Sequence, residues 1–502
     1  MQLPHFLIFT NTRGSVWQRS IGAYQVAHHC RINGYDVQVI DFTDFFNSNE
    51  LISICEKLVS DKLLAVGIST TFYSFVNEDY NNPILVPTAG SIFRGHAGVD
   101  SQIESAIDFI KSSVPSVKII AGGANSWQME GNPFFDAVFH GYSEESVVNY
   151  LNELQSGKKK ALHKKIGKQD IINGDLEKFD IENLQHRFIE QDIILNNETL
   201  PIEITRGCIF KCKFCAYPLN GKKKLDYIRD YDLIKKELIE NYTKFGTTNY
   251  FFTDDTFNDS TEKVAALHSV FTQLPFKINF VCFLRADLLY KHTEQIVLLK
   301  EMGLSSVVFG IESFHPYAAK AIGKGMDRNK LKTFLLDLYY KQWNSEISIT
   351  CSMIVGLPKE TEKDLRESFE WFRNEGRDLC DNWYPLSINT DTHYQSAFDK
   401  DHHRYGYTLN VDGEDWVSNT MTHSTAFSIS KEFNDIAMYK ENMPGSWMIM
   451  ALRSHGYSQE ELMNWKIKDM PWKSILKKRL RMAGQYKKQL LDYINATQDC
   501  TI

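Results

Sequence analysis

Three cysteines crowd one short stretch of this chain. The segment "RGCIFKCKFCAYP", residues 206–218, contains Cys208, Cys212 and Cys215, and the whole chain has nine cysteines. Thiolates are soft ligands, and several of them close together on a loop suit zinc or an iron-sulfur cluster. A structural zinc site needs four ligands, usually as two separated pairs, and no second CxxC follows here. A four-iron cluster held by three thiolates leaves one iron open to a substrate or cofactor.

The spacing CxxxCxxC, directly after a predicted strand and with an aromatic residue before the third cysteine, resembles the radical S-adenosylmethionine (SAM) superfamily. This resemblance implies a 4Fe-4S cluster ligated by Cys208, Cys212 and Cys215. It implies that SAM binds the open iron through its amino and carboxylate groups. An electron from the reduced cluster would then cleave SAM to a 5'-deoxyadenosyl radical, which abstracts hydrogen from a substrate. No catalytic residue is assigned beyond the cluster ligands.

Polar groups follow the later strands of the predicted barrel, where barrel enzymes place functional residues. Carboxylates after the second strand would accept hydrogen bonds from the methionine ammonium, and an arginine after the third would pair with its carboxylate. The resemblance implies these SAM contacts: Phe214, Asp254, Asp255, Arg285, Glu312, Ser313, Gly356 and Pro358. One departure is Lys359, which stands where the family spacing places a glutamate, so that Glu360 is a shifted equivalent. Taken singly, such polar pairs also serve to cap loops.

The elements that must position these residues fall into three parts. Residues 1–155 alternate short apolar strands with helix-length segments, which predicts a doubly wound, Rossmann-like parallel sheet. Residues 156–200 are basic and poor in large apolar side chains, as in a linker. Residues 201–395 contain six strand and helix pairs, which predicts a partial (β/α)6 barrel, and residues 396–502 are predicted to be mainly helical and to close its substrate side. The fold class is therefore α/β.

The first part resembles the cobalamin-binding domain that precedes the barrel in one branch of the superfamily. The residues that carry this resemblance lie in "GISTTF", "AGGAN" and "DAVFHGYSEES", the last with Asp136, Gly141 and Glu144. The implied cobalamin contacts are Ser69, Thr70, Gly122 and Gly123. Glycines at strand ends let a backbone approach a bulky ligand closely. The loop "TNTRGSVWQRSIG" lacks the histidine of the DxHxxG motif that ligates cobalt, which implies cobalt without a protein imidazole, or no cobalamin. The long segment 73–98 is predicted to cover or fill this ligand face.

Composition limits the partners and the compartment. The formal charge of −7 gives no global reason to bind nucleic acid, and no segment reaches the roughly 18 unbroken apolar residues of a membrane span. Six scattered cysteines are typical of a reducing compartment, so a cytoplasmic location is expected. The expected partners are an unidentified small-molecule or peptide substrate and an electron donor such as flavodoxin or ferredoxin.

Several functions are compatible with these patterns. The leading hypothesis is a radical SAM enzyme that abstracts hydrogen from its substrate, with cobalamin-dependent C-methylation if cobalamin is bound. Without cobalamin, the same radical would serve a rearrangement or an oxidation. Sulfur insertion would require a second cysteine cluster, and the first part of the chain has only Cys30 and Cys55. The alternative from another class is a non-catalytic protein that binds zinc or an iron-sulfur cluster.

Overall fold

The structure is a computed structural model of the whole chain. It describes residues 3–11, 17–71, 99–158, 163–174, 180–217, 219, 221–222, 226–390, 394–439 and 444–499. Residues 73–98, which the sequence predicts to cover the ligand face of the first domain, lie outside the described residues.

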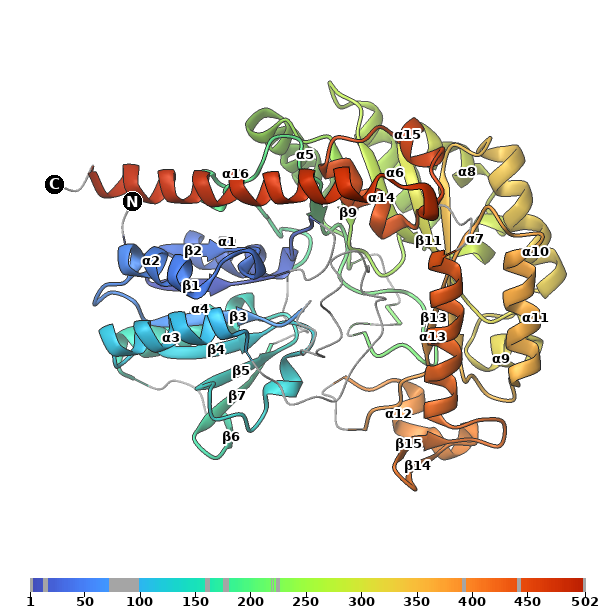
Figure 1. Ribbon diagram of the computed structural model, residues 1–502, viewed down its shortest axis with the longest axis horizontal. Coiled ribbons are helices and arrows are strands. Elements are labelled where there is room, and N and C mark those ends of the chain that lie inside the picture. The colour runs from blue at the N-terminus through green and yellow to red at the C-terminus, as the bar shows by residue number, and fades with distance from the viewer. Residues whose placement is uncertain are drawn as a thin grey trace.

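The first domain is a seven-stranded sheet with strand order β2-β1-β3-β4-β5-β7-β6 (Figure 1). Its strands are β1 (Phe6–Phe9), β2 (Val37–Ile40), β3 (Ala65–Ser69), β4 (Lys118–Gly122), β5 (Ala137–His140), β6 (Lys164–Ile166) and β7 (Gln169–Asn173). All pairs are parallel except β6 with β7. The hairpin of β6 and β7 lies within the range predicted as a linker, so the first sheet continues into that range.

Helices cover both faces of this sheet, as the doubly wound fold requires. They are α1 (Ile21–Ile32), α2 (Ser48–Leu58), α3 (Ser101–Ser113) and α4 (Glu144–Ser156). Alternate strand residues enter different cores: Phe6 and Ile8 pack with α1 and α4, whereas Leu7 and Phe9 pack with α2 and α3. This alternation follows from the period-two geometry of a strand.

The second sheet has six parallel strands in the order β13-β12-β11-β10-β9-β8. The strands are β8 (Leu200–Ile202), β9 (Asn249–Phe252), β10 (Asn279–Leu284), β11 (Leu304–Glu312), β12 (Ser348–Val355) and β13 (Cys380–Pro385). The main helices between them are α5 (Tyr231–Phe245), α6 (Thr261–Thr272), α7 (Ala286–Lys291), α8 (Glu294–Glu301), α9 (Pro316–Ala321), α10 (Arg328–Asp337) and α11 (Glu362–Arg373). Their apolar faces join one hydrophobic core, which extends into the face of the first sheet that α1 covers. The predicted fold class, a Rossmann-like domain followed by a partial (β/α)6 barrel, is confirmed.

Three helices of the C-terminal region, α13, α14 and α16, pack against the rest of the fold. Its elements are α12 (Ala397–Asp401), β14 (Thr408–Val411), β15 (Glu414–Val417), α13 (His423–Tyr439), α14 (Ser446–Ser454), α15 (Gln459–Met463) and α16 (Trp472–Asp499). Helix α13 covers the open edge of β13, where the Asn434 side chain bonds the backbone N–H and C=O of Trp383 at 2.9 and 2.7 Å. Such pairing protects an exposed strand edge. Helix α14 lies on the concave face of the second sheet, and α16 crosses to the first domain and packs beside α2 (Figure 1).

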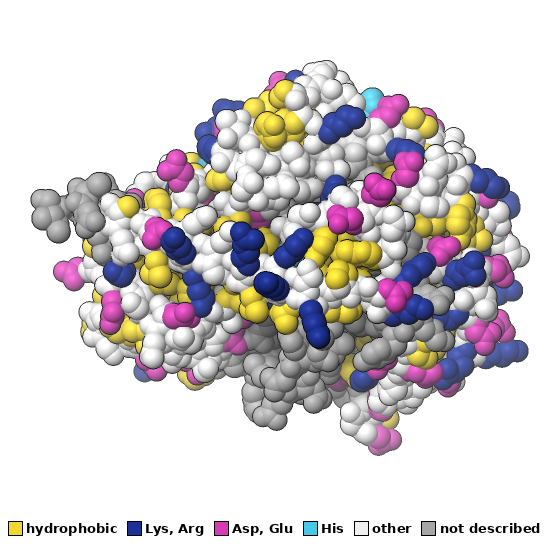
Figure 2. Space-filling model, turned by 45° about the horizontal axis from the view of Figure 1, so that its top comes forward, with side chains coloured by type: hydrophobic (Ala, Val, Ile, Leu, Met, Phe, Trp, Pro, Cys, Tyr) yellow, Lys and Arg dark blue, Asp and Glu magenta, His cyan; other side chains and the backbone are white. Residues whose placement is uncertain are grey.

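One face of α16 is basic. The exposed side chains along it include Lys473, Lys477, Arg481 and Lys488. Figure 2 shows Lys and Arg side chains gathered across the middle of the face that includes this helix. Among the described residues no helix is long and apolar enough to span a bilayer.

Candidate active site

The cysteine loop begins after β8, at the carboxyl edge of the second sheet. Cys208 is buried, and its Sγ lies 3.5 Å from the hydroxyl of Thr256. The Sγ of Cys212 accepts a hydrogen bond of 3.4 Å from Arg285, which follows β10. Cys212 and Cys215 are partly exposed. The loop therefore touches the ends of two neighbouring strands and keeps two of its thiols accessible.

Glycine allows this loop to fold back on itself. Gly207 has φ +115°, and a Cβ there would come within 2.7 Å of the Leu219 carbonyl oxygen. The carbonyl of Cys208 accepts hydrogen bonds from the backbone N–H groups of Gly221 and Lys222 at 2.7 and 3.0 Å. These bonds close the loop around its first cysteine.

Within the described ranges, no three His, Cys, Asp or Glu side chains gather closely enough to share one metal ion. Zinc ligands do gather in this way, with Zn–S distances of about 2.3 Å. In a four-iron cluster each thiolate binds a different iron, so its three sulfurs stand around a larger body. The donor set of three thiolates on one loop is the set that such a cluster uses.

Two adjacent carboxyl groups follow β9. Asp254 is fully buried, and Thr205 Oγ1 donates to its Oδ1 at 2.5 Å, while its Oδ2 has no partner among the described residues. Burial raises the pKa of Asp254 to about 6. Burial, and then the nearby Asp254, raises the pKa of Asp255 to about 7. A cation entering this place would lower both pKa values and bind two acceptors, so the pair suits an ammonium group.

Arg285 is already engaged by protein groups. Its Nε and Nη2 donate to the two carboxylate oxygens of Asp287 at 3.0 and 2.7 Å, and its Nη1 reaches Cys212. Its guanidinium also lies over the Phe210 ring, 4.0 Å from the centroid. The arginine predicted to pair with the SAM carboxylate thus also fixes the cysteine loop against β10.

A β-bulge sets the direction of Glu312. The pairing of β11 with β12 shifts register between Gly310 and Glu312, and Glu312 has φ +68°. Its carboxylate pairs with Lys324 Nζ at 2.8 Å. A Cβ at Gly310 would come within 2.4 Å of Glu312 Oε1, so glycine makes room for this pair. Bulges commonly redirect a side chain beside an active site.

Ser313 and Glu360 join the ends of β11 and β12. The Ser313 hydroxyl donates to Oε1 of Glu360, and it accepts from the backbone N–H of His315 at 2.9 Å. Glu360 is fully buried, and burial raises its pKa to about 8. The glutamate that stands one place later than the family spacing therefore holds Ser313, at the site predicted for SAM, in place.

The segment after β12 packs against the C-terminal region. Gly356 has φ +99°, and a Cβ there would come within 2.6 Å of the Trp416 ring. Tyr407 donates a hydrogen bond of 2.7 Å to the Gly356 carbonyl oxygen. Pro358 is buried in the same turn. The C-terminal region thus buttresses the backbone predicted to meet the adenine.

Four predicted cobalamin contacts lie at the carboxyl edge of the first sheet. Ser69 ends β3 and Thr70 directly follows it, where the Thr70 hydroxyl donates to the Gly122 carbonyl oxygen at 3.0 Å. Gly123 has φ +110°, and a Cβ there would come within 2.8 Å of the Thr71 backbone nitrogen. A side-chain hydrogen bond therefore joins the ends of β3 and β4, and Thr70 is fully buried at that edge.

The end of β1 holds polar groups that the sequence reasoning missed. Thr10 and Asn11 are each 1% exposed, and Thr10 Oγ1 and both side-chain polar atoms of Asn11 lack a partner within the described residues. Strands β1 and β3 flank the point where this sheet reverses its order, the usual ligand crevice of such folds. Buried polar atoms without partners fit a polar ligand at this edge. Their sequence signal was only "TN" after the first predicted strand.

The two carboxyl edges meet through Arg206, which directly precedes the cysteine loop. Its Nε bonds both oxygens of Glu203 at 2.8 and 2.9 Å, and its Nη2 pairs with Glu144 at the start of α4. Its guanidinium lies 4.3 Å from the ring centroid of Tyr142. Burial, with Glu203 and Asp255 nearby, raises the pKa of Tyr142. The first domain thus places a tyrosine beside the cysteine loop, a residue that sequence reasoning missed.

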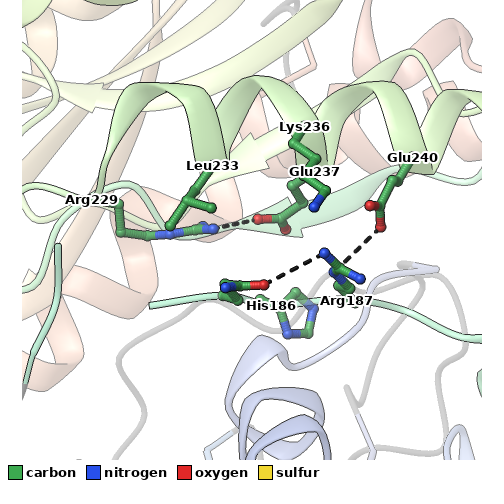
Figure 3. Close-up of a pocket in the computed structure, with 8 residues that line it drawn as sticks. His186, Arg187, Arg229, Leu233, Lys236, Glu237 and Glu240 are labelled. Carbon is green, nitrogen blue, oxygen red and sulfur yellow. Dashed lines mark hydrogen bonds and ion pairs between the residues drawn. The ribbon is translucent and has the colours of Figure 1, made fainter. Parts of the chain in front are cut away.

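A separate small pocket lies between the segment before β8 and helix α5 (Figure 3). Its lining residues are Gln185, His186, Arg187, Arg229, Leu233, Lys236, Glu237 and Glu240. Arg229 pairs with Glu237 at 2.7 Å, and Arg187 pairs with Glu240 at 3.5 Å. The Arg187–Glu240 pair ties the segment to α5, so the pocket serves the fold rather than a ligand.

Comparisons with known proteins agree with this geometry. Residues 202–372 match the model of the Radical SAM superfamily. A protein of Pyrococcus horikoshii, "Uncharacterized methyltransferase PH0819", is 25% identical over 168 residues, which are 33% of this chain. The match spans only 35% of that relative.

Two solved structures share the arrangement of both domains. The radical SAM methyltransferase TsrM from Kitasatospora setae, solved with tryptophan substrate and a SAM analogue, has a TM-score of 0.63 and 13% identity, covering 96% of this chain and 100% of that one. The cobalamin-dependent radical SAM enzyme OxsB, solved with aqua-cobalamin and SAM, has a TM-score of 0.58 and 13% identity, covering 98% and 78%. At these identities the likeness shows a common fold.

Proposed function

We propose that this chain is a radical SAM enzyme, as the match of residues 202–372 to that superfamily supports, and that it uses cobalamin to methylate carbon in an unidentified substrate. One observation carries the proposal: Arg206 joins the cysteine loop to Glu144, so the carboxyl edges of both sheets face one site. A cofactor on the first sheet would there lie beside SAM at the cysteine loop. The relative named a methyltransferase and the fold of TsrM support the same reaction class.

The residues present fit a 4Fe-4S cluster with SAM on the second sheet and cobalamin on the first. Cys208, Cys212 and Cys215 would hold a 4Fe-4S cluster, and the partnerless Oδ2 of Asp254 fits an ammonium group. The buried polar atoms of Asn11 fit a polar ligand on the first sheet. When bound, the reduced cluster supplies the electron that cleaves SAM, and cobalamin supplies a transferable methyl group.

The protein's own part is binding, orientation and proton control. Arg285 fixes the cysteine loop to β10 through Cys212, and Asp287 orients the guanidinium by accepting two hydrogen bonds from it. Asp254 and Asp255 have pKa values near 6 and 7, so an incoming ammonium would drive both to the charged form. The bulge at Glu312 and the clamp of Glu360 on Ser313 hold the next two strand ends. These fixed groups limit the reorganisation needed when SAM binds.

The first test compares the wild type with Cys212→Ala after anaerobic reconstitution with iron and sulfide. Reduced wild type is expected to contain four irons per chain and to form 5'-deoxyadenosine from SAM, while the variant forms none. Cys55→Ala, which removes a buried thiol from α2, is the matched control and should retain the activity. Product formation by Cys212→Ala would refute the assignment of the cluster.

The second test concerns cobalamin. We expect added hydroxocobalamin to remain with the protein through gel filtration, and S-adenosylhomocysteine to appear as the product of methyl transfer. If SAM is cleaved but cobalamin elutes separately, the methyl-transfer proposal fails and a cobalamin-independent rearrangement or oxidation takes its place.

A further inference from the structure

The concave face of the second sheet is divided by helix α14. Ser446, the first residue of α14, donates to the Val307 carbonyl oxygen at 2.9 Å, and its N–H bonds Thr350 Oγ1 at 2.9 Å. At the next strand, a Cβ on Gly445 would come within 3.0 Å of Cys380 Sγ. On β12 and β13, the start of α14 therefore covers the amino-terminal ends of the strands, as far as Thr350 and Cys380, while on β10 Trp447 reaches Phe283.

Beyond α14, four side chains form a patch on strands β12 and β13. Ser352 is paired in register with Asn382, and Ile354 is paired with Tyr384. Residues two apart on a strand share a face, so these four continue the face of Thr350 toward the carboxyl edge. All four are partly exposed, whereas Met353 and Trp383, the residues between them on the two strands, are buried. We name these four residues the β12–β13 patch.

Charge distinguishes the patch from the rest of the face. The ends of β9, β10 and β11 carry Asp255, Arg285 and the Glu312–Lys324 pair. The proposed function puts SAM at these strand ends. The patch itself contains a hydroxyl, an amide, an aliphatic group and a phenol. Burial raises the pKa of Tyr384, with Cys380 and Glu312 nearby, and its phenol lies beside the Ser352 and Asn382 side chains. A charged substrate group would lose its hydration here without gaining a counter-charge.

Building on the proposed function, we propose that the β12–β13 patch binds the substrate next to its reacting carbon, and that this part is an uncharged amide-type group beside apolar carbon. Asn382 offers one acceptor and two donors, which match the C=O and N–H of an amide, a lactam or an amide-like heterocycle. Ser352 and Tyr384 add hydroxyl groups that donate or accept, and Ile354 contacts carbon. A buried amide partner discriminates strongly against analogues that leave it unpaired.

The chemistry of the charged and neutral parts of this face also indicates where SAM and the substrate would lie. SAM at the charged strand ends and the substrate at the neutral ones would lie on neighbouring strands, because β11 pairs directly with β12. The Glu312–Lys324 pair fills the space beside Gly310, the pairing partner of Ser352, so this pair marks the border between the two binding regions. The substrate's reacting carbon would therefore face the SAM side, while its amide-type group rests on Asn382.

The test uses the cluster-reconstituted, SAM-bound protein and three probes in equilibrium dialysis. Indole-3-carboxamide and indole-3-carboxylate have nearly the same shape and differ in charge, and N-acetylglycinamide carries the amides without the ring. We expect the carboxamide to bind at least about tenfold more tightly than the carboxylate, and Asn382→Leu to remove most of that preference. Tyr384→Phe, which keeps the ring, is the second variant, and we expect it to weaken carboxamide binding several-fold. Asn149→Leu, on the exposed face of α4, is the control and should change nothing.

The outcomes separate this inference from the proposed function. Binding of N-acetylglycinamide to the patch would indicate a peptide-type amide, and binding of the indole amide alone would indicate a ring-bearing substrate. Equal or tighter carboxylate binding, no binding of any probe to the wild type, or indifference of the carboxamide to both variants would each overturn the inference. Formation of 5'-deoxyadenosine is measured on the same preparations, and its loss from the wild type would instead count against the proposed function.

Discussion

Replacing Glu360 by glutamine should change how the stability of the protein depends on pH. Glu360 is 1% exposed, and only its Oε1 has a side-chain partner, the Ser313 hydroxyl. Burial raises its pKa from 4.5 to about 8, against the opposing effect of the Ser313 hydrogen bond. The folded protein therefore holds Glu360 neutral at pH 6. Glutamine is neutral at every pH, has nearly the same shape and also accepts from Ser313.

The sign follows from where the proton resides. Between pH 4.5 and pH 8 the folded protein keeps the proton and the unfolded chain has lost it, so rising pH lowers the free energy of unfolding. Each pH unit in this window corresponds to about 1.4 kcal/mol, which gives an upper limit of about 5 kcal/mol at pH 8. The variant lacks this loss. It should match the wild type near pH 4.5 and exceed it by a few kcal/mol at pH 8.5.

Urea unfolding of the cluster-free protein, followed by tryptophan fluorescence from pH 5 to pH 9, measures this difference. The control is Glu370→Gln, which removes an exposed carboxylate from the same helix, α11, and should stay within about 0.5 kcal/mol of the wild type at every pH. Parallel pH profiles for the wild type and Glu360→Gln would mean that Glu360 is ionised inside the fold. The reasoning from burial would then be wrong.

Two further predictions concern the junction and the first sheet. Arg206→Met leaves two buried carboxylates without their cation and should cost about 3–5 kcal/mol, whereas Arg187→Met, in a partly exposed ion pair, should cost less than about 1 kcal/mol. Equal urea midpoints for these variants would contradict the role of Arg206. Gly123→Ala forces a Cβ against the Thr71 backbone at positive φ and should lower the free energy of unfolding by about 1–3 kcal/mol. Gly22→Ala, at an open helical position, should raise it by roughly 0.4–1 kcal/mol. Thermal melts compare the pair, and a stabilised Gly123→Ala would refute the close contact.

The sequence indicated the fold because its strands are apolar runs with clear endings. The runs that contain β9 to β13 are each followed by polar residues or glycine, so both the strands and the residues at their ends could be placed. The end of helix α1 could also be predicted, because Gly34 follows it, and the structure places Gly34 at φ +88°, a conformation that favours glycine. The hairpin of β6 and β7 was missed because "KKI" in β6 has two exposed lysines and "QDIIN" in β7 has only two apolar residues.

Contacts across the junction could not be predicted in the same way. Arg206 and Glu144 are 62 residues apart, and nothing in either segment signals the other. Their pairing depends on how the two domains dock, which the shared apolar core decides. The amphipathic pattern likewise predicted helices in the C-terminal region, but not that α14 would enter the concave face or that α16 would cross to the first domain. The expectation that this region closes the substrate side stays a prediction.

Glu312 shows most directly what the sequence leaves out. The letters "FGIES" placed a carboxylate at a strand end, but its direction comes from a register shift between β11 and β12, and register is a property of two strands. A non-glycine residue at φ +68° costs about 1–3 kcal/mol and persists only where its surroundings enforce it. Here Lys324 binds the carboxylate at 2.8 Å, and Gly310 leaves the space that the pair requires. Three separate features thus hold one strained residue at the boundary between the charged and the neutral parts of the concave face, which is where SAM and substrate would have to meet.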